Sequence, residues 1–251
     1  MRIYQARLKV FLLALAAVSP IKAGVVHDAT ADYLAGWTSA SNPNGAWSYG
    51  WSITPGSDFT KYTTTAVLVG QLDMWYDPSN FTLNTPGVYL NVGSTLTGQI
   101  DNFPGGALAI HGGGIDTACG GGTCFSEIVW TAPAPGLVDL AATFTGRETS
   151  MPQGLVEIIK LIGSTPTTLL SADVTDGTSQ SLNQLGIAVQ SGDQILFASR
   201  TQDGTLRENF TQIDATLTEN PPSVPEPTAL GLTGLGLAFL LARRRMTGNG
   251  E

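Results

Sequence analysis

The chain has 251 residues and a formal net charge of −8, with 12 Lys and Arg against 20 Asp and Glu. Only 13% of the residues are charged and 42% are hydrophobic, which excludes a disordered acidic chain, because disorder requires low hydrophobicity and a high charge density. The stretch 24–223 holds five Lys and Arg against eighteen Asp and Glu. Such a surface repels phosphate backbones, so we expect no binding to nucleic acid.

The N-terminus is typical of an export signal. Three basic residues within the first nine positions precede an apolar run over residues 10–18, and Ala23 places a small residue before a cut ahead of Gly24. This is the order of segments in a secretory signal peptide. We therefore predict that residues 1–23 are a signal peptide, and that His27, close behind the cut, lies in a disordered end.

Residues 24–219 have the pattern of one all-β domain. Apolar and polar residues alternate over 137–145, 195–200 and 213–218, which is the period of a strand with one buried face. Further strands are expected over residues 63–72, 87–96, 127–131, 155–162 and 168–174. Turns rich in Gly and Pro separate these segments, and the mature chain has no convincing helical period. The fold class predicted is an antiparallel β-sandwich or jelly roll.

Aromatic residues gather early in this domain. The candidate glycan-binding residues are Trp47, Tyr49, Trp51, Trp75 and Tyr76. In an extended segment the first three share one face, where they either stack on the apolar faces of sugars or fill the core, since each ring buries about 150–250 Å². Both readings stay open. We expect Trp47 to be exposed, because it follows the turn-forming residues 42–45, and Trp51 to lie in the core.

Two cysteines, Cys119 and Cys124, are separated by Gly-Gly-Gly-Thr. In an exported chain this spacing favours a disulfide. A loop this short gains less than the roughly 3 kcal/mol expected for a 15-residue loop, so the bond would pin a local loop rather than hold the fold. A metal or redox site is the alternative, although no third cysteine or histidine lies beside them.

Motifs of catalysis are absent from the sequence. It contains no Gly-x-Ser-x-Gly, no Walker A loop and no His-Glu-x-x-His. With only His27 and His111, we predict no imidazole triad, no metal site, no cofactor and no enzyme. The alternative is a secreted glycoside hydrolase, whose two carboxyl groups would lie roughly 5–10 Å apart in a cleft.

The C-terminus changes abruptly in composition. Residues 220–227 are rich in proline and must be extended, residues 228–242 carry no charge, and three arginines open the tail 243–251. Fifteen residues reach about 22 Å, short of a bilayer core of about 30 Å, but snorkelling arginines extend the match. We predict a transmembrane helix over 228–242 with the basic tail on the cytoplasmic side.

These residues resemble a known export signal. The motif is Val224, Pro225, Glu226 and Pro227, then a short apolar helix, then Arg243, Arg244 and Arg245. It resembles the PEP-CTERM sorting signal of Gram-negative bacteria that make extracellular polysaccharide. The resemblance implies recognition and cleavage by an exosortase near Glu226. It also implies an inner-membrane intermediate and a final location at the cell surface or outside the cell.

Three internal segments, 42–51, 129–133 and 144–146, are similar to ectodomains found upstream of this signal. That resemblance implies a jelly roll like those of carbohydrate modules and supplies no catalytic residue. The function expected is a non-catalytic surface or matrix protein associated with extracellular polysaccharide. The alternative remains a secreted carbohydrate-active enzyme with paired carboxylates.

Overall fold

A computed structural model describes residues 24–37, 41–78, 86–98, 100, 102–113, 123–149, 154–202 and 210–220. The predicted signal peptide, the proline-rich linker after Asn220, the predicted membrane helix over 228–242 and the basic tail lie outside these residues. Within the described ranges, no helix is long and apolar enough to cross a membrane.

The described elements are almost all strands. In chain order they are β1 (Val25–Asp28), α2 (Ala29–Trp37), β2 (Trp47–Ser52), β3 (Thr60–Lys61), β4 (Thr64–Leu68), β5 (Leu72–Tyr76), β6 (Gly87–Asn91), β7 (Leu108–His111), β8 (Phe125–Thr131), β9 (Gly136–Gly146), β10 (Gly154–Ile162), β11 (Thr165–Val174), β12 (Ser179–Val189), β13 (Gln194–Thr201) and β14 (Phe210–Asn220).

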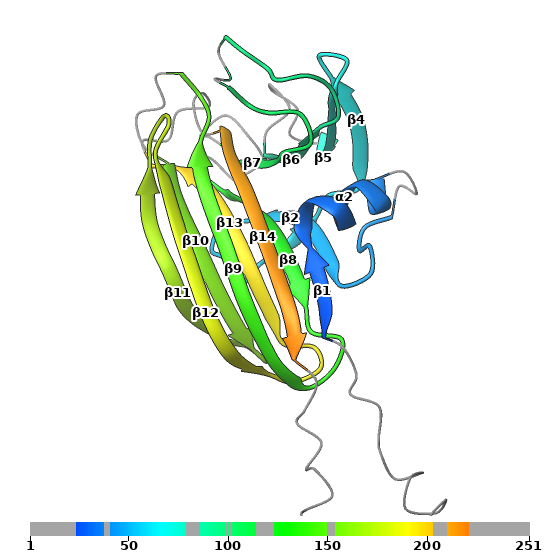
Figure 1. Ribbon diagram of the computed structural model, residues 1–251, viewed down its shortest axis with the longest axis vertical. Helices are drawn as coiled ribbons and strands as arrows, with labels where there is room; N and C mark the ends of the chain where they lie inside the picture. Colours follow the sequence, from blue (N-terminus) through cyan, green and yellow to red (C-terminus); the bar gives the residue numbers. More distant parts are fainter. Residues whose placement is uncertain are drawn as a thin grey trace, which may run out of the picture. The chain divides into compact units, whose positions relative to one another are not determined.

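Two antiparallel sheets pack face to face (Figure 1). In the described residues, sheet A has eight strands in the order β12-β9-β14-β7-β6-β5-β4, with β1 beside β14. Sheet B has six strands in the order β11-β10-β13-β8-β2-β3. The last eight strands form two interleaved sets, β7-β14-β9-β12 and β8-β13-β10-β11, which is the topology of a jelly roll. The predicted antiparallel sandwich is therefore confirmed, and the earlier strands widen both sheets.

The main core lies between the sheets and follows the predicted alternation. On β9, Val138, Leu140 and Phe144 are buried, whereas Ala141 between them is exposed. The neighbouring β14 repeats the pattern with Ile213, Ala215 and Leu217 inside. Alternation was readable in the sequence here because each strand has one face in the core and one in solvent.

Two loops cover parts of the outer faces. The described residues of the 92–107 loop fold over β5 to β7, where Phe103 and Ala107 pack against Leu72, Met74 and Tyr89. Residues 53–59 fold over sheet B, where Phe59 packs against a small cluster formed by Val129, Ile159 and Leu196. Gly50 on β2 permits this second approach, because a Cβ there would lie only 2.3 Å from the Thr60 carbonyl oxygen.

The expected single strand over 63–72 is wrong. It is a hairpin, in which β4 and β5 pair across a tight turn at Val69 and Gly70. Both turn residues have positive φ, 46° and 75°, as a type I′ hairpin turn requires. Valine at the first position hid this turn from sequence analysis, because β-branched residues rarely adopt positive φ.

Neither helix α2 nor an ordered strand β1 at the start of the domain was expected. Asp28 caps the helix, since its Oδ1 accepts hydrogen bonds from the backbone N–H groups of Thr30 and Ala31 at 3.0 and 2.9 Å. Tyr33 then anchors the helix by donating to carbonyl oxygens on sheet A. A helix of nine residues held by tertiary contacts has too few turns to reveal a period.

Candidate functional site

Three of the five predicted glycan-contact residues are core residues. The exposed fractions of Trp47, Tyr49 and Trp75 are 1%, 0% and 2%. The inward face of β2 carries Trp47 and Tyr49 into the cluster between the sheets. The expectation that Trp47 is exposed is therefore wrong: its turn sets the direction of the chain, but the pleat of β2 directs the side chain inward.

The other two residues, Trp51 and Tyr76, are only half-buried. Trp51 packs against the core between the sheets and donates from Nε1 to the Asp77 carboxylate at 3.3 Å. Tyr76 packs on the opposite face of sheet A, beneath the 92–107 loop. They stay candidates for ligand contact, but they do not form one aromatic platform.

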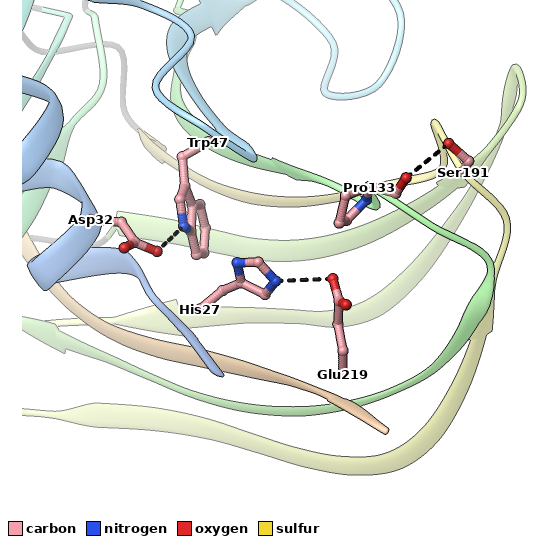
Figure 2. Close-up of polar contacts among 6 residues, drawn as sticks. All are labelled: His27, Asp32, Trp47, Pro133, Ser191 and Glu219. Atoms are coloured by element: carbon pink, nitrogen blue, oxygen red, sulfur yellow. Dashed lines mark hydrogen bonds and ion pairs between the residues drawn. The ribbon is translucent and has the colours of Figure 1, made fainter. Parts of the chain in front are cut away.

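Trp47 belongs to a cluster of polar contacts at one end of the sandwich (Figure 2). Its Nε1 donates to Oδ2 of Asp32 on α2 at 2.7 Å. Beside it, Nε2 of His27 lies 2.9 Å from Oε1 of Glu219, and the His27 ring packs edge-on to Trp130 with centroids 5.6 Å apart. These contacts join β1, α2, β2, β8 and β14.

His27 is thus an ordered residue of β1, which corrects the expectation of disorder. Antiparallel pairing sets Val25 opposite Glu219, so the sandwich begins and ends at the same place (Figure 1). The second histidine, His111, lies 3.8 Å from Glu148 and is buried. His27 therefore contacts a carboxylate on β14, and His111 contacts one in the segment after β9.

Of the predicted disulfide, only Cys124 is described. It is fully buried, and its backbone exchanges hydrogen bonds with Gly113 at 3.0 and 3.1 Å. This contact holds the end of β7 against the start of β8. Cys119 lies outside the described residues, so the disulfide stays a prediction.

We expect thiol labelling of the exported protein, denatured without reductant, to detect no free cysteine. Reduction should then expose two thiols and change the melting temperature little, because the loop is short. Full labelling before reduction would contradict the disulfide, and unfolding on reduction would contradict its local role.

One carboxyl group is fully buried outside the core. Glu127 on β8 faces the outer side of sheet B between Gly50 and Ala198, and its exposed fraction is 0%. Its Oε1 accepts a hydrogen bond from Ser52, whereas its Oε2 has no partner among the described residues. Burial raises the pKa of Glu127 to about 7, and nearby Asp58 and Glu157 add to the rise.

Glu127 and Glu157 lie in one row across sheet B, separated only by Ala198. With strands about 4.8 Å apart, the backbones of the two residues are roughly 10 Å apart. The pair is therefore the one to compare with the two carboxyl groups of a glycoside hydrolase on this face. Glu127 has no exposed surface, however, so the pair does not face a cleft. In the described part of the chain, no group of three or more His, Cys, Asp or Glu residues is arranged to hold a metal ion.

A polar groove of about 470 Å³ lies on the outer face of sheet A. Its floor is formed around the small side chain of Ala141, and its walls are formed by Asp28, Thr30, Gly106, Thr143, Asn183, Asp214 and Thr216. The register explains the arrangement. Asn183, Ala141, Thr216 and Asp28 occupy one row across β12, β9, β14 and β1.

The groove is walled because other elements rise above the sheet. The β1–α2 corner, with Asp28 and Thr30, stands on one side, and the 92–107 loop contributes Gly106. Among the described residues, no aromatic or basic side chain lines it. Its donors and acceptors are carboxylates, hydroxyls and one amide, and its volume lies within the range typical of small-molecule sites.

No residue of this groove stands out in the sequence as a candidate binding residue. Apart from the buried Ala142 and Ala215, they are small or polar residues at outward strand positions, in a turn or at the start of α2, and such residues are usual on any solvated sheet face. The residues come from five separate segments. The one available signal was the row of outward Ala and Thr residues on β9 and β14.

The C-terminal resemblance is confirmed by comparison with protein families. The family model of the PEP-CTERM protein-sorting motif matches residues 223–245. The match covers the Pro-Glu-Pro sequence, the apolar run and the three arginines. A signal of this kind marks an exported protein. The comparison with curated proteins found no match.

Solved structures show only distant similarity. The CBM22-1 xylan-binding domain of Paenibacillus barcinonensis Xyn10C is 9% identical, with a TM-score of 0.34 over 80% of this chain and 99% of that one. The family 22 carbohydrate-binding module of Clostridium thermocellum Xyn10B is 10% identical, with a TM-score of 0.32 over 69% and 99%. Murine APRIL is 10% identical, with a TM-score of 0.29 over 36% and 70%. These scores are low, so no ligand is transferred from these proteins.

Proposed function

Because the chain carries a PEP-CTERM protein-sorting motif, we propose that it is a cell-surface or matrix protein processed by an exosortase and associated with extracellular polysaccharide. The single observation that carries the proposal is the complete motif over residues 223–245. Because Glu226 stands between two prolines, its backbone has few conformations to choose from. We therefore expect its binding to a processing enzyme to cost little conformational entropy.

The sandwich supplies the second part of the proposal. Its outer face on sheet A offers a groove of hydroxyl, amide and carboxylate groups, which are the groups that pair with sugar hydroxyls. The four strands that line the groove contribute small side chains, so this part of the face stays open. The polysaccharide of the producing cell is the proposed partner.

We propose a binding protein rather than an enzyme. Hydrolysis of a glycosidic bond needs two carboxyl groups that both reach the substrate. Glu127 and Glu157 do not meet this need, because Glu127 is fully buried beneath residues 53–59. Asp28 and Asp214 both line the groove on sheet A, but Asp28 caps α2 through Oδ1 and Asp214 accepts a hydrogen bond from Gln212. A secreted glycoside hydrolase therefore remains the less favoured alternative.

In the producing organism, we expect the mature protein to co-purify with the extracellular polysaccharide and to be cut at both ends. Intact-mass analysis should place the cuts near Ala23–Gly24 and near Glu226. A variant with Pro225, Glu226 and Pro227 replaced by alanine should keep its C-terminal segment and stay in the membrane fraction.

The matched control replaces Pro221 and Pro222, which lie in the same linker but before the matched residues. This variant should be processed normally. A secreted product that retains both residues 10–18 and residues 230–241 contradicts processing. A fully processed protein that never sediments with the polysaccharide contradicts the association.

A further inference from the structure

We infer that the groove on the outer face of sheet A is a glycan site that selects neutral, hydroxyl-rich polysaccharides over anionic ones. The inference rests on the proposed function and narrows it, because it assigns the site and the class of glycan. It is carried by the geometry of the groove and by the charges on its walls.

The first observation is the charge of the walls. Among the described residues, the ionisable groups that line the groove are Asp28 and Asp214, and both are acidic. Arg147 donates from Nε to the Gln212 side chain at 2.9 Å and does not line the groove. A uronate or sulfate group in the groove would therefore meet two carboxylates and no lining cation, which disfavours it by like-charge repulsion.

The second observation is the position of the two carboxylates. Asp28 already uses Oδ1 to cap α2, and Asp214 accepts from Gln212 Nε2 at 2.9 Å. These bonds fix both groups in place, so little side-chain entropy is lost when a ligand binds. Hydroxyl groups of a neutral sugar donate to such carboxylates in charge-assisted hydrogen bonds.

The third observation is the hydroxyl and amide groups between them. Thr143 on β9 is paired in register with Asp214 on β14, and Thr216 lies beside Ala141. On the far side, Asn183 of β12 is exposed and offers both a donor and an acceptor. The row from Asn183 to Asp28 spans four strands, about 14 Å, which suits a chain molecule lying across the sheet.

The size of Ala141 is what keeps the groove open. Its side chain is exposed at the floor, and a tryptophan there would fill the space without entering the core. Leu137 lies on the same strand and the same outward face, and it is also exposed, but it does not line the groove. It therefore provides a matched position for a steric control.

The test is affinity electrophoresis of the secreted protein in gels containing dextran, galactomannan, alginate, chitosan or the polysaccharide of the producing organism. We expect retardation by a neutral polymer, none by alginate, and no dependence on salt, since screening affects only charged partners. Ala141→Trp should weaken binding at least about tenfold, whereas Leu137→Trp should leave it unchanged. Melting temperatures check that both variants fold.

A second variant keeps the inference testable if Ala141→Trp misfolds. Asp28→Asn with Asp214→Asn preserves the helix cap, because asparagine is as good an N-cap as aspartate, and should weaken binding to the neutral polymer. Binding that survives both variants overturns the groove but leaves polysaccharide association intact. Retention by alginate, or by chitosan alone with loss in salt, overturns the neutral class. Failure to bind any of these polymers overturns the association and the site together.

Discussion

Replacing Trp47 by alanine is expected to lower the free energy of unfolding by roughly 3–5 kcal/mol. The indole is 1% exposed, lies 6.2 Å from the Phe197 ring between centroids, and donates to Asp32 at 2.7 Å. The substitution therefore opens a cavity and removes a hydrogen bond from a carboxylate. In a domain of this size, the melting temperature should fall by roughly 6–20 °C.

Two variants separate the contributions. Trp47→Phe keeps most of the buried ring and loses the hydrogen bond, so it should cost about 1–3 kcal/mol. Trp51→Ala removes a half-buried ring and should cost less than Trp47→Ala. A Trp47→Ala protein that melts like the wild type but no longer binds polysaccharide would contradict the core position of this ring.

Glu127→Gln is expected to remove a loss of stability that the wild-type protein suffers as the pH rises. Burial holds the pKa of Glu127 at about 7, above its ordinary value of 4.5, so the folded protein binds this proton more tightly than the unfolded chain does. The stabilisation is complete below about pH 4.5 and is lost as the pH rises through about 7. Over that interval the wild type loses roughly 3 kcal/mol relative to the glutamine variant.

The measurement is thermal melting of both proteins between pH 4.5 and 8.5. Their melting temperatures should be similar at the acidic end and should diverge towards the alkaline end, where the variant melts higher by roughly 6–12 °C. Glu157→Gln is the control, because Glu157 is half-buried and accepts from Ser171 at 3.1 Å. It should reduce the pH dependence only slightly. A difference between wild type and Glu127→Gln that is constant with pH would contradict the burial of an ionisable carboxyl.

Both predictions concern side chains whose direction the sequence left open. Alternation along a strand shows which residues share a face with Trp47 or with Glu127, but it does not show which of the two faces lies in the core. Trp47 faces the core because β2 pairs with β8 in one register. The same register turns Glu127 to the outer face, under residues 53–59. A shift of one residue would exchange the two faces, and only the pairing excludes it.

Local features were determined by the sequence alone. The sorting motif is contiguous, so its three parts were readable in order, and the family model matches the same residues. The strands β9, β13 and β14 were also readable, because a core on one side and solvent on the other impose a period of two. From these strands and the turns between them, the class of fold followed.

Tertiary structure decided which residues meet. The groove joins Asp28 to Asn183 across 155 positions of the chain through the pairing of four strands, and its members are ordinary surface residues until they are brought together. The aromatic residues, conspicuous in the sequence, went mostly to the core, since burying a large ring between two sheets is more favourable than exposing it. Sequence therefore determined the export signal and the sandwich, whereas the position of the candidate site depended on long-range register, for which no local pattern carries a signal.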